Sequence, residues 1–340
     1  MRTVSIELFF AWILLACSHL RRASAYEMDD YFENEVKPSY SMKDGNLAMS
    51  CNCSWGTMPN EFQVDNRRRI GYKIVGGSPV NFNRGENYPM LAAIQPDQGC
   101  TFCGASILTE FHALTAAHCF EQDLPKMTLA VGIRYRCREP YDGGQYIPLL
   151  DPPYIHEYYD DEENQYDIAI VVTQWKILFG NNVGPVCIYT KPFISMEESI
   201  LALGWGRVAE DGNPSRELLK VVMKPLDIEI CKDMAPPGVI NTNLNLQMCT
   251  YSYNKDTCAG DSGGPLFIMD HSVDRLIQVA IVSMGVGCGR SDEPGINTFI
   301  FPYLGWIQWT IERSLRKMHP KEFHQCGNSF CYFTKPLRNN

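Results

Sequence analysis

The sequence predicts an all-β fold, an antiparallel barrel or sandwich with a single C-terminal α-helix packed against it. From Ile74 onward, short apolar runs alternate with Gly, Pro, Asn and Asp residues, which is typical of many short strands joined by turns. These runs are residues 90–94, 104–108, 128–131, 168–172, 200–203, 218–222, 265–268 and 276–282. Helical spacing of apolar residues occurs only late, at Leu304, Ile307, Ile311 and Leu315, which predicts one amphipathic helix.

Residues 1–25 have the layout of a secretory signal peptide. An apolar block, Leu8–Cys17, follows Arg2, and Ala23-Ser24-Ala25 offers a small-residue cleavage site. The block has about ten residues, whereas a helix that spans a bilayer needs about 20. No later segment reaches that length. We therefore expect a secreted, extracellular protein with no membrane anchoring.

Residues 26–73 differ in composition from the strand-rich part that follows them. Residues 26–46 are acidic and can bury little apolar surface, so we expect them to be poorly ordered. Cys51 and Cys53 follow, and then a basic run at Arg67–Arg69. At the other end of the chain, residues 316–340 form a basic tail.

Composition limits the compartment and the partners. The 14 cysteines of the 340 residues indicate an oxidising compartment. The formal net charge is -9, so the chain has no overall basic character that would favour nucleic acid. Neither an H-E-x-x-H nor a calcium-loop pattern is present, and we expect no metal and no cofactor.

The segment Gly260-Asp261-Ser262-Gly263-Gly264-Pro265 is the densest chemical signal. Acyl transfer needs an exposed hydroxyl beside backbone N–H groups that can point at an oxyanion, and the glycines permit such a tight backbone. His118 ends a run of small residues beside Cys119, and Asp167 stands at the entrance of an apolar run. The chain order His118, Asp167, Ser262 is that of a chymotrypsin-type catalytic triad.

Two motifs in the sequence also allow a different interpretation. Gly260–Gly264 also satisfies G-x-S-x-G, the nucleophile elbow of α/β-hydrolases, which would indicate an esterase or lipase. That elbow requires a helix directly after Ser262, but residues 265–268 are strand-like. Cys100-Thr101-Phe102-Cys103 imitates a C-x-x-C metal or redox motif, although disulfides are favoured in a secreted chain.

Taken in order, the motifs resemble the trypsin/chymotrypsin family of serine endopeptidases. They are Ile74-Val75-Gly76-Gly77, Thr115-Ala116-Ala117-His118-Cys119, Asp167-Ile168-Ala169, Gly204-Trp205-Gly206 and Gly260–Pro265. The resemblance covers residues 74–315 and implies two antiparallel six-stranded β-barrels with the active site between them and a C-terminal α-helix. Cys51-Asn52-Cys53 and Asn87-Tyr88-Pro89-Met90 further resemble secreted arthropod proteases of the trypsin-like type.

The resemblance implies a role for each motif residue. Ser262 would be the nucleophile, His118 the general base and then acid, and Asp167 the group that orients the imidazole. The N–H groups of Gly260 and Ser262 would form the oxyanion hole.

The resemblance also implies cleavage after Arg or Lys. Asp256 matches the floor of the primary specificity pocket, and Gly285 and Gly295 match its open walls. Two departures from the family pattern are Met284, where tryptophan is usual, and Asn297, where tyrosine is common. The acidic run at 160–163 belongs to an expected cleft-rim loop. Such a run is ordinarily just solvated, and the alternative is that it favours basic residues elsewhere in the substrate.

The junction Lys73-Ile74 resembles a zymogen activation site, which makes residues 26–73 a pro-segment. Cutting after Lys73 by an activating protease would free the α-amino group of Ile74, which would pair with Asp261. Arg67–Arg69 offers a second processing site.

The family pattern also implies disulfides. The pairs are Cys103–Cys119, Cys231–Cys249 and Cys258–Cys288, and Cys187 would bind Cys51 or Cys53. We expect two further bridges, Cys100–Cys137 and Cys326–Cys331. One of the two pro-segment cysteines is then left over, because removal of Cys17 with the signal peptide leaves an odd count.

The sequence therefore predicts a secreted, trypsin-like serine endopeptidase made as a zymogen. Its partners would be protein or peptide substrates, an activating protease and protease inhibitors. The alternative from another class is a catalytically silent homologue that acts as a binding or cascade cofactor protein. Such proteins typically lose a triad residue, whereas all three are present here.

Overall fold

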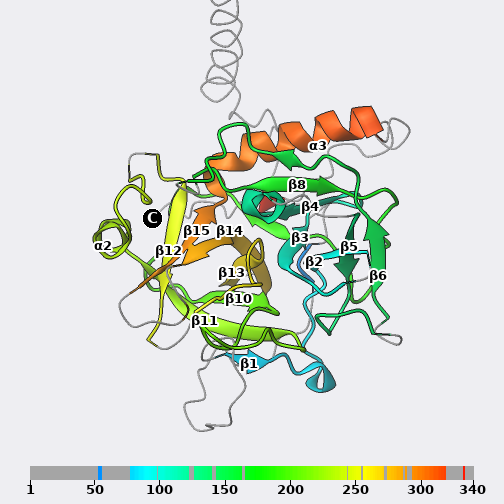
Figure 1. Cartoon of the computed structure of the whole chain (residues 1–340), viewed down its shortest axis with the longest axis horizontal. Coiled ribbons are helices and arrows are strands. Elements are labelled where there is room, and N and C mark those ends of the chain that lie inside the picture. The colour runs from blue at the N-terminus through cyan, green and yellow to red at the C-terminus, as the bar shows by residue number, and fades with distance from the viewer. Residues whose placement is uncertain are drawn as a thin grey trace, which may run out of the picture. The chain divides into compact units, whose positions relative to one another are not determined.

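The computed structural model describes most of the strand-rich part of the chain (Figure 1). The described residues are 53–55, 77–97, 99–121, 126–139, 143–162, 165–242, 244–253, 256–271, 274–285, 288, 293–318 and the backbone of 332–333. The predicted signal peptide, Cys51, the Lys73-Ile74 junction, Cys326 and Cys331 lie outside this part. Among the described residues, no helix is long and apolar enough to span a bilayer.

Six antiparallel strands close into a barrel in the C-terminal half of the described chain. Their order is β13-β10-β11-β12-β15-β14, and β14 pairs again with β13. The bounds are β10 Ile200–Gly204, β11 Leu219–Leu226, β12 Gln247–Tyr251, β13 Pro265–Asp270, β14 Arg275–Gly285 and β15 Gly295–Phe299. Three short strands extend this sheet: β1 (Ser78–Pro79) pairs with β11, β9 (Cys187–Tyr189) runs parallel to β14, and β16 (Tyr332–Phe333) runs parallel to β9.

A second sheet has seven strands in the order β6-β5-β2-β3-β4-β8-β7. The bounds are β2 Leu91–Pro96, β3 Cys103–Ile107, β4 His112–Thr115, β5 Met127–Val131, β6 Gln145–Pro148, β7 Tyr154–Ile155 and β8 Ala169–Val172. No continuous ladder closes it. Just beyond β6, an isolated bridge joins Leu149 to Thr173, so the second barrel is only partly closed.

Helices are few in the described part of the chain. They are α2 (Ile228–Met234), α3 (Leu304–Met318) and the short 3-10 turns η1 (Phe82–Arg84), η2 (Ala117–Phe120) and η3 (Phe301–Tyr303). Helix α3 is the predicted amphipathic helix, and it buries Ile307, Ile311 and Leu315. Figure 1 shows α3 lying beside β8 of the seven-stranded sheet.

A buried hydrogen bond between side chains fixes α3 to that sheet. The ring of His112, at the start of β4, is fully buried, and its Nε2 lies 2.6 Å from the Ser314 hydroxyl. Its Nδ1 lies 2.5 Å from the Thr109 hydroxyl, so both ring nitrogens are satisfied in the core.

The main hydrophobic core contains residues of both sheets. Leu114 and Ile170 of the seven-stranded sheet and Phe267 of the barrel belong to one buried cluster with Trp205 and Ile307. The prediction of an all-β fold with one C-terminal amphipathic helix is therefore confirmed.

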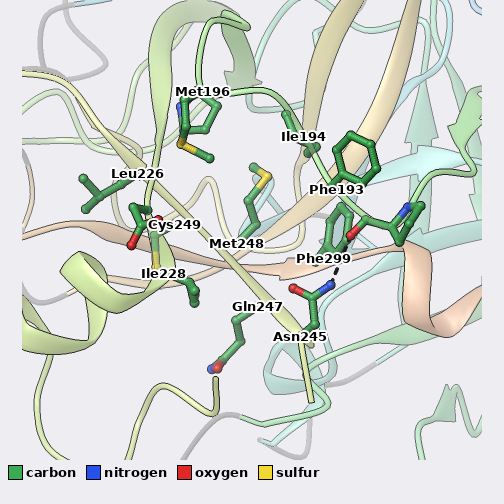
Figure 2. Close-up of a pocket in the computed structure, with 13 residues that line it drawn as sticks. Phe193, Ile194, Met196, Leu226, Ile228, Asn245, Gln247, Met248, Cys249 and Phe299 are labelled. Atoms are coloured by element: carbon green, nitrogen blue, oxygen red, sulfur yellow. Dashed lines mark hydrogen bonds between the residues drawn. The ribbon is translucent and has the colours of Figure 1, made fainter. Parts of the chain in front are cut away.

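The closed barrel also carries an apolar groove on its surface, with a volume of about 170 Å³ (Figure 2). Its lining comes from the loop after β9, the end of β11, the start of α2, and β12. Six of its residues are Phe193, Ile194, Met196, Leu226, Ile228 and Met248.

Candidate active site

His118 and Asp167 are brought together by the register of two neighbouring strands. β4 pairs with β8, with Thr115 opposite Ala169, and the two functional residues lie just beyond β4 and just before β8. His118 Nδ1 is 2.7 Å from Asp167 Oδ2, and the His118 backbone N–H donates to Asp167 Oδ1 at 2.9 Å. The carboxylate is fully buried, while the imidazole retains 20% of its side-chain exposure.

The closed barrel supplies two further hydrogen bonds to Asp167. The hydroxyl of Ser283 in β14 donates to Asp167 Oδ2 at 2.5 Å, and that of Thr298 in β15 donates to the Asp167 carbonyl at 2.8 Å. No sequence motif assigned a role to either residue. The one sequence feature that points to Ser283 is its hydroxyl, which directly follows the apolar residues 279–282.

This environment sets the tautomer and basicity of His118. Because Nδ1 faces a carboxylate, it carries the ring proton and leaves Nε2 as the acceptor. Burial acts to lower the pKa of His118, but the hydrogen bond and charge of Asp167, with a further contribution from Glu121, outweigh it and raise the pKa.

An aromatic cluster fixes the chain just before Asp167. The His156 ring stacks on Tyr166 at a centroid distance of 5.1 Å and also contacts Tyr303 and Trp306. Burial lowers the pKa of His156 to about 4, with Glu157 acting in the opposite direction, so the ring is neutral at pH 7. This histidine therefore packs as an uncharged aromatic group.

Ser262 lies on a tight turn that packs directly on the β3–β4 region. The Gly104 N–H donates to the Ser262 carbonyl at 2.7 Å. Gly263 has φ +75°, and a Cβ there would collide with the Thr115 hydroxyl, three residues before His118. Ser262 and His118 are both described and partly exposed, and no hydrogen bond joins their side chains in this structure. Catalytic hydrogen bonds are often long before substrate binds.

The backbone around Ser262 leaves two N–H groups available. The N–H groups of Asp261, Gly263 and Gly264 donate to backbone carbonyls. Those of Gly260 and Ser262 donate to no acceptor among the described residues. Gly260 has φ +100°, a conformation that favours glycine. The turn thus presents two donors of the kind that an oxyanion requires.

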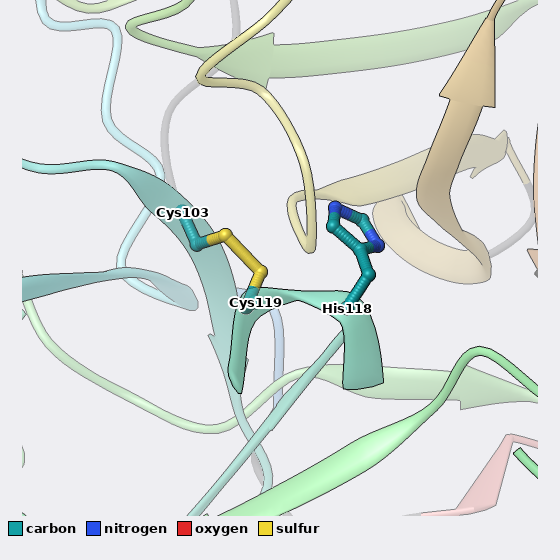
Figure 3. Close-up of side chains that lie close together, drawn as sticks. All are labelled: Cys103, His118 and Cys119. Carbon is teal, nitrogen blue, oxygen red and sulfur yellow. A yellow bond between two sulfur atoms is a disulfide. The ribbon is translucent and has the colours of Figure 1, made fainter. Parts of the chain in front are cut away.

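His118 is also braced by a neighbouring disulfide. Ligand atoms of Cys103, His118 and Cys119 lie within 4.8 Å of one another, which is close enough for a metal site. Figure 3 shows that the two sulfurs are bonded to each other, so they are not thiolate ligands. The C-x-x-C motif is also divided between two disulfides, because Cys100 pairs with Cys137.

Asp261 is a buried carboxylate held by backbone groups alone. Its Oδ1 accepts from Gly206 N–H at 2.8 Å and its Oδ2 from Cys258 N–H at 3.0 Å. The pKa of Asp261 is raised to about 6, mainly by burial and also by the charge of Asp256. The two backbone hydrogen bonds act in the opposite direction and only partly offset this rise. No cationic group among the described residues pairs with it. A buried carboxylate with backbone donors on both oxygens therefore lies beside the Ser262 turn.

Asp256 lies close to Gly295 of β15, which in turn contacts Thr250 of β12. It is nearly buried, and its Oδ1 accepts from Thr257 N–H at 2.8 Å. Gly285 pairs with Gly295, and a Cβ at Gly295 would lie 3.2 Å from Asp256 Oδ1. The two glycines and the aspartate of the predicted pocket are therefore neighbours.

Asn297 joins the two strands near Asp256. Its Nδ2 donates to the Met248 carbonyl at 3.1 Å, the Thr250 hydroxyl at 3.2 Å and the Gly295 carbonyl at 3.3 Å. An amide thus replaces the tyrosine expected from the family pattern and joins β12 to β15. Met284, the other departure, pairs with Ile296 and is partly exposed.

Five disulfides lie within the described residues. They are Cys53–Cys187, Cys100–Cys137, Cys103–Cys119, Cys231–Cys249 and Cys258–Cys288. Cys51 and Cys53 were the two expected partners of Cys187, and in the structure the disulfide is formed by Cys53.

The residues after Cys53 dock on the same region. The Ser54 N–H donates to the Pro185 carbonyl at 2.8 Å, and the Ser54 hydroxyl accepts from Cys187 N–H at 2.9 Å. The Trp55 indole N–H donates to the Gly180 carbonyl at 3.1 Å.

Comparisons with known proteins agree with this geometry. The family model described as Trypsin matches residues 74–307. Venom serine protease 34 of Apis mellifera is 30% identical over 80% of this chain, and Venom serine protease of Polistes dominula is 32% identical over 76%. The matched regions cover 63% and 87% of those two proteins. Transmembrane protease serine 11G of Rattus norvegicus is 27% identical over 69% of this chain and 55% of its own length. The chain therefore belongs to the trypsin family of serine proteases.

Proposed function

We propose that the chain is a secreted serine endopeptidase, made as a zymogen, that hydrolyses peptide bonds after Arg or Lys. The observation that carries this proposal is the buried Asp167 carboxylate, which is hydrogen-bonded to His118 Nδ1 at 2.7 Å and leaves Nε2 facing outward as a base. Two relatives named venom serine proteases support secretion of this chain.

The reaction begins with attack of Ser262 Oγ on the substrate carbonyl carbon, while His118 Nε2 takes the hydroxyl proton. The carbonyl oxygen becomes an oxyanion and accepts from the N–H groups of Gly260 and Ser262. Protonated His118 then gives its proton to the leaving amine, and the C–N bond breaks to leave an acyl-enzyme. Water repeats the sequence with His118 as base, which releases the acid and restores Ser262.

Asp167 acts as a positioning group for His118. It holds the tautomer that has Nε2 free, and its charge stabilises the imidazolium that forms in each half-reaction. Ser283 fixes the carboxylate and Thr298 fixes the backbone carbonyl of Asp167, both from the other barrel, so the base is held where the two barrels meet.

Selectivity for Arg or Lys follows from a proposed substrate pocket at Asp256, the Asp256 recess. Removing a substrate cation from water is costly unless an opposite charge pairs with it, and Asp256, close to Gly295, provides that charge. The proposal also includes an activating protease that cuts after Lys73, and susceptibility to inhibitors that fill the same recess.

Asp256→Ser is expected to lower kcat/KM for arginyl peptide substrates by about 10²- to 10³-fold, because the substrate cation then enters the recess unpaired. The measurement compares arginyl and phenylalanyl chromogenic peptides on the trypsin-activated, repurified protein. Asp211→Ser, which changes an exposed aspartate, is the matched control and should leave both rates unchanged. A wild-type preference for phenylalanyl peptides would contradict the proposed specificity.

The pH dependence of kcat/KM tests the base. Catalysis needs neutral Nε2, so the rate should rise with pH through a pKa above 6.5, because the folded pKa of His118 is raised. Asp167→Asn removes the main cause of that rise and leaves the effect of burial. The acid limb, the part of the pH profile in which kcat/KM rises with pH, should then move to lower pH. In addition, kcat should be about 10⁴-fold lower, because the tautomer of His118 is no longer fixed.

Glu121→Gln is the matched control for that experiment. It removes the smaller of the two charges that raise the pKa of His118 and leaves the tautomer unchanged. A slight shift of the limb to lower pH with nearly unchanged kcat is expected. An acid limb at higher pH in Asp167→Asn than in wild type would refute the assignment of the base.

A further inference from the structure

The groove on the closed barrel is rigidly built and largely apolar. Figure 2 shows Met248 between Met196 on one side and Phe193 on the other. The Phe193 side chain is 70% exposed and Met196 is 51% exposed, so the groove has no cover among the described residues. Exposed apolar side chains that gather in this way mark a binding surface.

Hydrogen bonds hold the loop that forms one wall of the groove. The Asn245 side chain donates to the Pro192 carbonyl at 3.2 Å, which Figure 2 marks with a dashed line. The Lys224 ammonium donates to the carbonyls of Glu197 and Glu198 at 2.8 and 3.0 Å. The groove is thus formed before any ligand enters, and binding would require little ordering of the loop.

The strand beside this loop is already paired with the C-terminal tail. β16 runs parallel to β9, with Tyr332 opposite Ile188 and Phe333 opposite Tyr189. This pairing satisfies the outer edge of β9 by strand addition. Because the two strands are parallel, β16 runs in the same direction as β9, toward the end of β9 at which the chain continues beyond Tyr189.

That direction leads to the groove. Pro192 and Phe193, three and four residues beyond Tyr189, line it. Leu337 is four residues beyond Phe333, a reach of about 13 Å for extended chain. It is also the largest apolar side chain in the last seven residues, Thr334-Lys335-Pro336-Leu337-Arg338-Asn339-Asn340.

The charges around the groove complement the tail. Asp227 lines the groove, and three more acidic residues lie within two sequence positions of lining residues, against two basic ones: Glu197, Glu198 and Glu229, with Lys191 and Lys224. The Lys224 ammonium is engaged by two carbonyls of the groove wall. Lys335 and Arg338 flank Pro336-Leu337 in the tail, so a basic segment meets an acidic rim.

We propose that residues 334–340 of this chain dock in the groove, with Leu337 filling it beside Met248 and Phe193. The segment is covalently connected to β16, so a weak intrinsic affinity is enough to keep it docked. A short flexible linker gives an effective concentration of about 1 mM. With an intrinsic Kd of about 0.1 mM, the docked form would outnumber the free form about tenfold. This inference does not depend on the proposed catalytic activity.

The test uses the full secreted chain carrying Ser262→Ala, which prevents self-digestion, and a second version that ends at Phe333. The probe is a fluorescent peptide with the sequence of residues 334–340, followed by fluorescence anisotropy. The truncated chain should bind it saturably near 0.1 mM, and the full chain about tenfold more weakly because its own tail competes. Adding Phe193→Ser to the truncated chain should abolish binding.

Hydrogen exchange on the same proteins gives a second readout. Truncation should speed exchange of the amides at 193–199 about tenfold, Leu337→Ser should have the same effect, and Asn339→Ser, the matched control, should not. Equal peptide binding by both chains, or no binding together with unchanged exchange, would overturn the proposal. A full chain that dimerises and loses its dimer on Phe193→Ser would place a second copy in the groove instead.

Discussion

Activated Ser262→Ala protein is expected to hydrolyse arginyl peptides about 10⁶-fold more slowly than the activated wild type. The loss is large because alanine leaves His118 without a hydroxyl to deprotonate, so no acyl-enzyme forms. The residual rate would come from substrate binding and from the N–H groups of Gly260 and Ser262, whose backbone positions do not depend on the serine hydroxyl.

Two measurements together make this test decisive. Steady-state kinetics give the rate, and a fluorophosphonate probe reports whether a reactive serine exists at all. Wild-type protein should be labelled, Ser262→Ala should not, and Ser199→Ala should behave as wild type. An activated wild type that resists the probe would indicate the silent-homologue alternative, whereas full activity of Ser262→Ala would show that another residue is the nucleophile.

The second large effect concerns activation. The uncut chain should be nearly inactive, with a rate at least about 10²- to 10³-fold below that of the cut chain, because Asp261 is buried without a cation. Cutting after Lys73 would supply the Ile74 ammonium to that carboxylate and order the Ser262 turn. Lys73→Gln should therefore remain inactive after trypsin treatment, while the control Arg69→Gln should be activated normally. Full activity with the Lys73–Ile74 bond intact would contradict this mechanism.

The same carboxylate predicts how the stability of the uncut chain depends on pH. The folded pKa of Asp261, about 6, lies above its unfolded value near 4, so ionisation favours the unfolded state. Below pH 4 Asp261 takes nothing from the free energy of unfolding. About 3 kcal/mol of that free energy is lost as the pH rises through 6. Denaturant unfolding of uncut Asp261→Asn should lack this loss, and the cut chain should show less of it.

Much of the fold could be predicted because most buried strands are predominantly apolar. The run expected at 200–203 is β10, and that expected at 276–282 lies within β14. Two missed strands carry buried polar groups. β12 and β15 contain Thr250 and Asn297, which are hydrogen-bonded to each other near Asp256, and their polarity hides the strand pattern.

The candidate site was predictable where local motifs place each residue, and less so where distant strands meet. His118 and Asp167 stand in recognisable motifs, but the approach of Ser283 to Asp167 depends on how the two barrels dock. The choice of Cys53 over Cys51 is likewise decided by the tertiary structure, through the contacts of Ser54 with Pro185 and Cys187.

The Cys53–Cys187 bond has a practical consequence for handling the protein. An affinity tag or fluorophore fused upstream of Cys53 would stay covalently linked to the two-sheet part of the chain after the Lys73–Ile74 bond is cut. The cut form could therefore be immobilised on a resin through that tag and washed free of the activating protease. Both cysteines are buried, so the link would withstand mild reductants.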